Sequence, residues 1–219
     1  MATRHAEALG DDSFEVDTDV RRPSEVGLGW LLVLGGLLSL ASAFILTLDK
    51  FKIAENPDFQ PSCNISPFIS CGNVMQSPEG EVFGFPNPLM GLIGFSIVVT
   101  IGVLLASRTE LPGWVWGGLQ IGVLFGIVQI HWLIFQSLYD IGSLCPYYMV
   151  VWAVMIPVFF FVTKRNLAAY GAHAGNGAAT AVATFLGNWA VLVLFFWYVA
   201  IVLLIAERFW TYWSDLIFG

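Results

Sequence analysis

Residues 26–48 read VGLGWLLVLGGLLSLASAFILTL and contain no charged side chain. An α-helix rises about 1.5 Å per residue, so a helix of this length crosses the ~30 Å hydrocarbon core of a bilayer. Four more uncharged stretches of roughly the length that a bilayer requires follow, at 89–107, 113–139, 146–163 and about 181–206. Five such stretches predict an all-α, polytopic membrane protein rather than a soluble domain.

The composition supports this prediction. The chain has 219 residues, of which 57% are hydrophobic and 11% charged, whereas a soluble domain carries about 25% charged residues. So few charges do not cover a water-exposed surface, but they suit a protein whose solvent is lipid. The nine Trp and eighteen Phe residues favour the same class, because aromatic side chains are frequent at bilayer interfaces. The net charge of −7 argues against a nucleic-acid partner.

The polar N-terminal segment and the basic residues predict the orientation. Residues 1–25 are acidic and lack hydrophobic periodicity, which is typical of a disordered tail. Six of the nine basic residues lie on the N-terminal side of the predicted membrane: Arg4, Arg21, Arg22, Arg108, Lys164 and Arg165. Lys50, Lys52 and Arg208 lie on the other side. The positive-inside rule therefore predicts that the tail is cytoplasmic.

This topology places all three cysteines on the extracytoplasmic side. Cys63 and Cys71 lie in the long loop 49–87, and Cys145 follows the short turn 140–144. That side is oxidising in cells that export proteins. Residues 207–219 are predicted to form a short extracytoplasmic C-terminal segment. The Gly- and Ala-rich stretch 166–180 has the composition of a flexible connector.

The spacing of the cysteines allows both a structural and a redox interpretation. A bridge between Cys63 and Cys71 is geometrically easy and would stabilise the fold by roughly 2–3 kcal/mol. Taken alone, this pair is more typical of a structural staple. Cys145 precedes Pro146, which predicts that it is the N-cap of the fourth membrane helix. The positive end of the helix dipole stabilises a thiolate there, and a thiolate close to a disulfide is what thiol–disulfide exchange requires.

Four other residues are candidates with more than one interpretation. Asn87 precedes Pro88 and is either the N-cap of the second helix or an amide donor to a ligand carbonyl. Trp152 lies seven residues after Cys145 and either packs in the core or forms a pocket wall. His131, within the third stretch, is a functional candidate by default, although a hydrogen-bonded histidine between helices is favoured. Ser77 before Pro78 indicates a turn.

Metal ligation is not predicted, because the sequence has no CxxC or HExxH motif and no carboxylate cluster in the apolar stretches.

Several motifs occur in an order typical of a known family. They are Cys63-x7-Cys71, Ser77 six residues later, FPNPLMG at 85–91, LCPY at 144–147 and MVVW at 149–152. Over roughly residues 28–165 the chain resembles the vitamin K epoxide reductase family, in its bacterial, DsbB-like branch without a fused thioredoxin domain. The resemblance implies a four-helix bundle around a quinone, with a fifth transmembrane helix, in the bacterial plasma membrane.

The resemblance also implies roles for particular residues. Cys63 would exchange with a separate thioredoxin-fold, DsbA-like partner, since the chain ends at Gly219 without such a domain. Cys71 would pass electrons to Cys145 and from there to a quinone of the menaquinone or ubiquinone type. Asn87 would donate a hydrogen bond to a quinone carbonyl, and Ser77, Tyr148 and Trp152 are further candidates for the cofactor site.

The chain departs from the family at Tyr148, which occupies the position of the second cysteine in the CxxC motif of Cys145-Pro146-Tyr147-Tyr148. In the family this thiol is the one nearest the quinone, so we expect quinone-coupled turnover by this chain to be impaired. Either the chain is an altered form that traps an intermediate, or it is a divergent member with weak or different activity. The alternative function is a quinone- or partner-binding membrane protein without turnover. A transporter or channel is disfavoured, because the apolar stretches lack charged residues.

Overall fold

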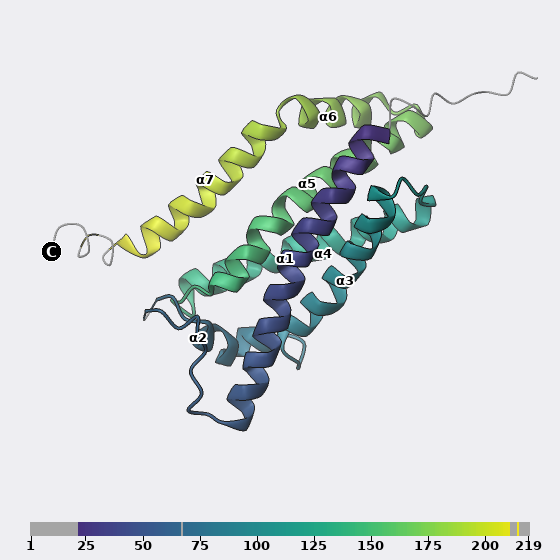
Figure 1. Cartoon of the computed structure of the whole chain (residues 1–219). Coiled ribbons are helices and arrows are strands. Elements are labelled where there is room, and N and C mark those ends of the chain that lie inside the picture. The colour runs from purple at the N-terminus through teal and green to yellow at the C-terminus, as the bar shows by residue number, and fades with distance from the viewer. Residues whose placement is uncertain (1–21, 67, 211–213, 215–219) are drawn as a thin grey trace, which may run out of the picture.

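The computed structural model describes residues 22–66, 68–210 and 214, and all of its regular elements are helices apart from isolated β-bridges (Figure 1). The elements are α1 (Arg22–Glu55), α2 (Cys71–Gln76), the short 3-10 helix η1 (Pro78–Glu81), α3 (Asn87–Ala106), α4 (Gly113–Tyr139), α5 (Pro146–Ala174), α6 (Gly177–Asn188) and α7 (Ala190–Arg208). Within this part of the chain, α1, α3, α4, α5 and α7 are long and apolar enough to cross a membrane. The predicted all-α, polytopic class is confirmed.

Helix α1 is longer than the first uncharged stretch. It begins at Arg22, so residues 22–25 of the predicted disordered tail are helical, while residues 1–21 lie outside the described residues. It also continues to Glu55, and the first turns of the predicted loop 49–87 therefore belong to the helix. A charged residue ends a hydrophobic stretch without ending the backbone hydrogen bonds of a helix, which explains both differences.

The prediction of a flexible connector at 166–180 is wrong. Residues 166–174 continue α5, and α6 begins at Gly177. Gly175 ends α5 with a φ of 61°, and the Asn176 side chain accepts hydrogen bonds from the first backbone N–H groups of α6. Gly171 lies directly against Thr180, so α5 and α6 form a close antiparallel hairpin. Alanine favours helix wherever such packing is available.

The fifth membrane segment starts later than predicted. The helical path breaks at Trp189, whose φ of −108° and ψ of 14° are not helical, and α7 begins at Ala190. Helix α7 has no buried residue. Glu207 and Arg208 of the predicted C-terminal segment are still helical, and residues 211–213 and 215–219 lie outside the described residues.

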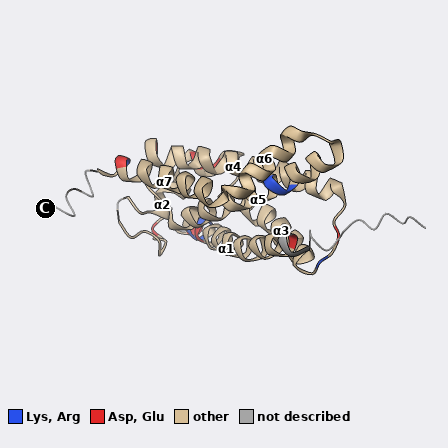
Figure 2. Cartoon of the chain, turned by 90° about the horizontal axis from the view of Figure 1, so that it is seen from above, with Lys and Arg blue, Asp and Glu red and all other residues tan. Residues whose placement is uncertain are grey.

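Four of the long helices form a bundle, and α7 lies along its outside (Figure 1). Helix α1 packs against α3 on one side and α5 on the other, and α4 packs against α5. Figure 2 shows that charged residues are sparse on the described helices and that most of the ribbon carries none. This distribution is typical of helices surrounded by lipid.

Two glycines bring α1 and α3 together. A Cβ atom on Gly29 would lie 2.5 Å from the backbone nitrogen of Ala106, and one on Gly102 would lie 2.8 Å from the backbone nitrogen of Val33. Small residues at a crossing let two backbones approach closely, which favours association of membrane helices. The α1–α3 contact therefore depends on the absence of side chains at these positions.

We expect Gly29→Ala to lower the free energy of unfolding by about 1–3 kcal/mol, because the methyl group would push the two backbones apart. Gly27→Ala is the matched control, since nothing lies within 4 Å of a Cβ atom there, and it is expected to be neutral or slightly stabilising. Unfolding of the purified chain by titration with a denaturing detergent measures both. Equal stability of the two variants would contradict the role of Gly29.

Candidate functional site

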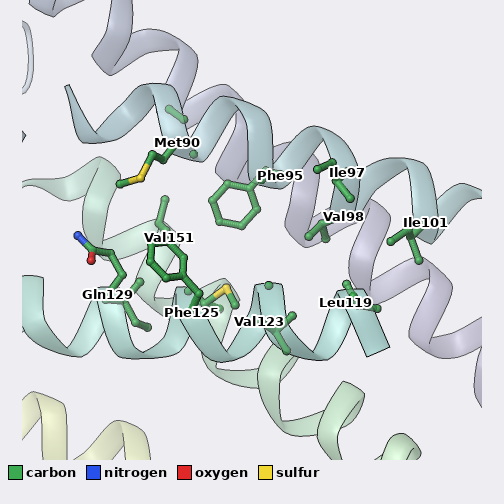
Figure 3. A pocket seen from close by; sticks show the side chains of 18 of the residues that line it. Met90, Phe95, Ile97, Val98, Ile101, Leu119, Val123, Phe125, Gln129 and Val151 are labelled. Carbon is green, nitrogen blue, oxygen red and sulfur yellow. The ribbon is translucent and has the colours of Figure 1, made fainter. Parts of the chain in front are cut away.

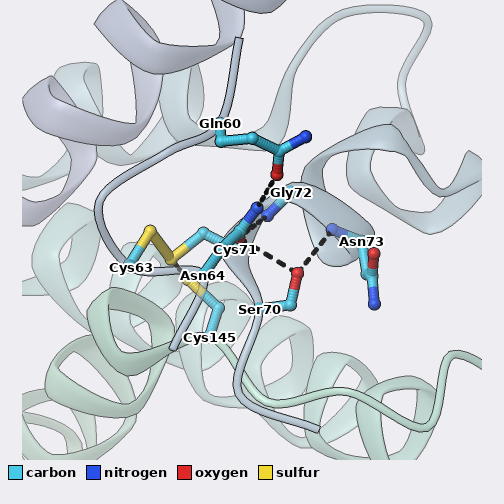
Figure 4. Close-up of a disulfide and its surroundings, with 8 residues drawn as sticks. All are labelled: Gln60, Cys63, Asn64, Ser70, Cys71, Gly72, Asn73 and Cys145. Atoms are coloured by element: carbon cyan, nitrogen blue, oxygen red, sulfur yellow. Dashed lines mark hydrogen bonds between the residues drawn. A yellow bond between two sulfur atoms is a disulfide. The ribbon is translucent and has the colours of Figure 1, made fainter. Parts of the chain in front are cut away.

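The three cysteines converge at one end of the bundle. Cys63 and Cys71 form a disulfide, and Cys145 is a free, buried thiol. The Sγ atom of Cys145 lies 3.0 Å from the Sγ atom of Cys71 (Figure 4). The structure thus places a thiol beside one particular sulfur of a disulfide, which is the arrangement needed for exchange.

A short backbone pairing brings Cys71 beside Cys145. Ile69 and Leu144 form a parallel β-bridge. The Leu144 N–H donates to the carbonyl of Phe68 at 2.7 Å, and the Ser70 N–H donates to the carbonyl of Leu144 at 3.0 Å. Because Cys71 and Cys145 follow the paired segments directly, the pairing places their side chains next to each other.

Asn64 organises the loop around the disulfide (Figure 4). Its Oδ1 accepts hydrogen bonds from the Gly72 N–H at 2.9 Å and from the Ser70 hydroxyl at 3.0 Å. Its Nδ2 donates to Gln60 at 2.8 Å, and the Ser70 hydroxyl accepts from the Asn73 N–H as the N-cap of α2. Sequence reasoning missed this residue, and its position next to Cys63 was the only available signal.

The loop is also attached to α1 and to the end of α7. The Lys50 ammonium donates to the Met75 carbonyl at 2.6 Å and pairs with Glu81 at 2.8 Å. At the C-terminal end of α7, Phe209 is buried and its ring centroid lies 5.8 Å from that of Phe68. These contacts hold the cysteine loop over the end of the bundle.

Cys145 is the N-cap of α5 with Pro146 after it, as predicted. The helix N-terminus acts to stabilise the thiolate, as predicted, but burial has the larger and opposite effect. Burial raises the pKa of the Cys145 thiol from its ordinary value of 9.0 to about 11, although the backbone N–H groups of Tyr148 and Tyr147 act to lower it. The loss of hydration outweighs the helix terminus, so the thiol is neutral at physiological pH.

The raised pKa of Cys145 can be tested directly, because Cys145 is the thiol that stays free while Cys63 and Cys71 are paired. At pH 10 a thiol with a pKa of about 11 is only about 10% ionised, whereas one with an ordinary value would be about 90% ionised. The difference in absorbance at 240 nm between the chain and its Cys145→Ser variant measures the thiolate. Ionisation that is nearly complete at pH 10 would contradict the effect of burial.

A cavity of about 530 Å³ lies between α3 and α4 (Figure 3). Its walls are almost entirely apolar and include Met90, Phe95, Val98 and Ile101 of α3, Leu119, Val123 and Phe125 of α4, and Val151 and Met155 of α5. Its lining residues Ile97, Trp114 and Phe125 are at least half exposed. The cavity therefore opens toward the outer surface of the bundle, where lipid is expected.

Asn87 and Tyr148 line this cavity, whereas Ser77 and Trp152 are not among its lining residues. Tyr148 occupies the position at which the resemblance places the second cysteine of a CxxC motif. A side chain at this position therefore lines the cavity. Trp152 is buried one turn further along α5. The Ser77 hydroxyl donates to the Val74 carbonyl at 3.0 Å and lies between α2 and η1, as expected of a turn residue.

Asn87 is not an N-cap, contrary to one of its two interpretations. Pro86 occupies the N-cap of α3, and Asn87 is the first helical residue. Its Nδ2 donates to the Glu79 carbonyl at 2.7 Å, and its Oδ1 accepts from the Val82 N–H at 3.3 Å. Asn87 therefore ties η1 to α3 at the edge of the cavity. Its predicted bond to a ligand stays a prediction.

Some buried polar atoms of the described residues have no hydrogen-bond partner, and three of these atoms belong to this region. They are Gln129 Nε2, the Tyr148 hydroxyl and Trp152 Nε1. Gln129 and Tyr148 both line the cavity. An unpaired buried donor is costly, so the donors of Gln129 and Tyr148 favour a ligand with acceptor groups in this cavity. Gln129 was not predicted as a site residue, and the only signal was a glutamine within an apolar stretch.

His131 has the structural role that the sequence favoured. Its Nδ1 lies 2.8 Å from the Ile127 carbonyl, and its Nε2 accepts a hydrogen bond from Trp197 Nε1 at 3.0 Å. It links α4 to α7. Among the described residues, no group of three or more potential ligands could hold a metal ion.

A membrane helix bundle that holds a loop disulfide against a buried thiol, beside an apolar cavity, is the arrangement expected of a membrane thiol–disulfide oxidoreductase. The sequence model of the vitamin K epoxide reductase family matches residues 30–163, which is more than half of the chain. The chain belongs to this family, whose members are quinone-linked oxidoreductases. No curated protein matches the chain. Helices α6 and α7 lie beyond the matched residues.

Proposed function

We propose that this chain accepts two electrons from the dithiol of a separate thioredoxin-fold protein and holds a quinone in the cavity between α3 and α4. The observation that carries the proposal is the 3.0 Å separation of the Cys145 and Cys71 sulfur atoms next to an intact Cys63–Cys71 disulfide. The cysteine end would face the extracytoplasmic side of a bacterial plasma membrane, in agreement with the distribution of Lys and Arg.

The first step is thiol–disulfide exchange with the partner. A partner thiolate attacks Cys63, Cys71 leaves as a thiolate, and the second partner thiol releases the mixed disulfide. The partner dithiol becomes a disulfide, and the loop disulfide becomes a dithiol, so two electrons and two protons move to the loop. Cys63 is the more accessible of the two sulfurs, because Cys71 is fully buried against Cys145 while Cys63 keeps a small exposed fraction.

A separate reaction, which starts from the oxidised loop and does not follow the first step, is an internal exchange. When the loop is oxidised, the deprotonated Cys145 sulfur attacks Cys71, the bond between Cys71 and Cys63 breaks, and Cys63 leaves as a thiolate that takes up the proton. One disulfide replaces another without net oxidation. In the family a second cysteine completes a dithiol that reduces the quinone. With Tyr148 there, only Cys63 can resolve the Cys71–Cys145 disulfide, and that returns the starting state.

The cavity is suited to a quinone of the menaquinone or ubiquinone type. Such a molecule combines an apolar ring and tail with two carbonyl oxygens, which accept hydrogen bonds. The apolar walls match the first part, and the unpaired donors of Gln129 and Tyr148 match the second. The open side of the cavity gives a lipid-soluble molecule a direct path from the bilayer.

Filling the cavity tests this proposal. Gly118 lines the cavity and its neighbour Gly117 does not, and nothing lies within 4 Å of a Cβ atom on either. We expect Gly118→Leu to weaken quinone binding by at least about tenfold through steric exclusion, and Gly117→Leu to leave it unchanged. Titration with a short-chain menaquinone, followed by quenching of tryptophan fluorescence, measures both. Equal binding by the two variants, or no binding by the unmodified chain, would overturn the assignment.

A second candidate function is quinone or partner binding without turnover. The specific observation in its favour is Tyr148, because a phenol does not replace a thiol in disulfide chemistry. A protein of this kind would keep the cavity and the loop disulfide but would not transfer electrons to the quinone. Substitution of Tyr148 distinguishes the two candidates.

A further inference from the structure

A second cavity lies at the end of the bundle opposite the cysteines. It has a volume of about 520 Å³ and is formed by α1 and α5. The residues that line it are Glu25, Gly27, Leu28, Leu31, Phe161, Lys164, Arg165, Ala168 and Ala169. We call it the basal pocket. It is independent of the quinone cavity, with which it shares no lining residue.

The basal pocket is apolar on one side and charged on the other. Leu28, Leu31 and Phe161 form apolar walls that continue toward the middle of the bundle, while Lys164 and Arg165 follow Phe161 toward the end of the membrane-spanning part. In Figure 2 basic residues lie on α5 close to α6. A pocket of this kind matches a molecule with a charged head and an apolar chain.

The two basic residues differ in their partners. Arg165 is already paired, because its Nη2 lies 3.1 Å from Glu25 and its guanidinium lies 3.5 Å from the centroid of the Trp116 ring. Lys164 makes no ion pair or hydrogen bond with the described residues, although it is half-buried and its side chain lies close to Gly187 of α6. Glu25 compensates Arg165, so the pocket keeps the positive charge of Lys164.

We propose that the basal pocket binds an anionic phospholipid, whose phosphate pairs with the Lys164 ammonium and whose acyl chain lies along Leu28, Leu31 and Phe161. Basic pockets between membrane helices are suited to anionic lipid head groups. The apolar walls select a lipid over free phosphate, because inorganic phosphate would leave them without a partner. The excess of Lys and Arg predicts that this end is cytoplasmic, where anionic lipids give the membrane surface its negative potential.

Native mass spectrometry of the full chain, titrated with phosphatidylglycerol in detergent, tests the proposal. We expect Lys164→Gln to weaken retention of one phosphatidylglycerol about fivefold. Arg108→Gln is the matched control, because Arg108 is an exposed basic residue at the same end that does not line the pocket, and it is expected to change nothing. Ala168→Phe keeps every charge but fills the pocket, and it should weaken retention as well.

Each outcome decides for or against the proposal. Equal retention by Lys164→Gln and the unmodified chain would overturn it, and equal loss in Arg108→Gln would show general attraction of anions instead of a site. Phosphatidylcholine is expected to be retained less well than phosphatidylglycerol. Displacement of phosphatidylglycerol by millimolar inorganic phosphate would show a phosphate site rather than a lipid site. None of these measurements depends on redox activity or on the quinone.

Discussion

Tyr148→Cys is expected to give the chain a rate of quinone reduction on the order of 1000-fold above that of the unmodified chain, by analogy with the loss caused by removing a catalytic nucleophile. The new thiol would stand three residues after Cys145, at the position that lines the quinone cavity. The two thiols can then form a disulfide while two electrons and two protons pass to the quinone, giving a quinol. The loss of quinone absorbance, with dithiothreitol as the electron donor, measures this rate.

Tyr148→Phe is the control for this experiment. It keeps the ring and removes the hydroxyl group, so we expect no turnover and weaker quinone binding through the loss of a hydrogen-bond donor. Turnover by the unmodified chain at the rate of Tyr148→Cys would refute the idea that Tyr148 stalls the reaction. If neither the unmodified chain nor Tyr148→Cys reduces quinone, a quinone- or partner-binding protein without turnover becomes the better description.

Cys63→Ser is expected to convert the site almost completely to a Cys71–Cys145 disulfide. Removal of Cys63 leaves Cys71 with one thiol beside it, that of Cys145 at 3.0 Å. With diamide as the oxidant, the two thiols lose two electrons and two protons, and diamide is reduced to the hydrazine. Mass spectrometry of peptides prepared without reduction identifies the linkage, and we expect it in more than about nine-tenths of the chains.

Cys145→Ser is the matched variant. It keeps the loop disulfide, since Cys63 and Cys71 remain paired. It removes the Cys145 thiol, so no exchange between Cys145 and Cys71 is possible. Persistence of two free thiols in oxidised Cys63→Ser would contradict the proposed contact. A Cys63–Cys145 linkage in a Cys71→Ser chain, formed as readily as the Cys71–Cys145 linkage, would show that the loop does not select one sulfur.

The membrane architecture was predictable because its physical cause is local. In lipid, each spanning segment must satisfy its own backbone hydrogen bonds and avoid charge, so the uncharged stretches beginning near Val26, Leu89, Gly113 and Pro146 each correspond to a long helix. The N-cap position of Cys145 followed from Pro146 in the same way. The segment 166–180 was mispredicted because its helices depend on the packing of Gly171 against Thr180, which composition does not reveal.

The amino-acid sequence alone indicates a polytopic membrane protein that resembles the vitamin K epoxide reductase family and whose cysteines share one end, because the number and length of the apolar stretches decide which segments lie on the same side of a bilayer. The contact between Cys71 and Cys145, which lie 74 residues apart in the chain, is visible only in the folded chain, because a backbone pairing between Ile69 and Leu144 aligns them. The fold also buries Cys145, which raises the pKa of its thiol, and it places Gln129 and Tyr148 in one cavity. Dehydration and facing side chains arise from contacts between distant segments, and spacing along the chain does not specify those contacts.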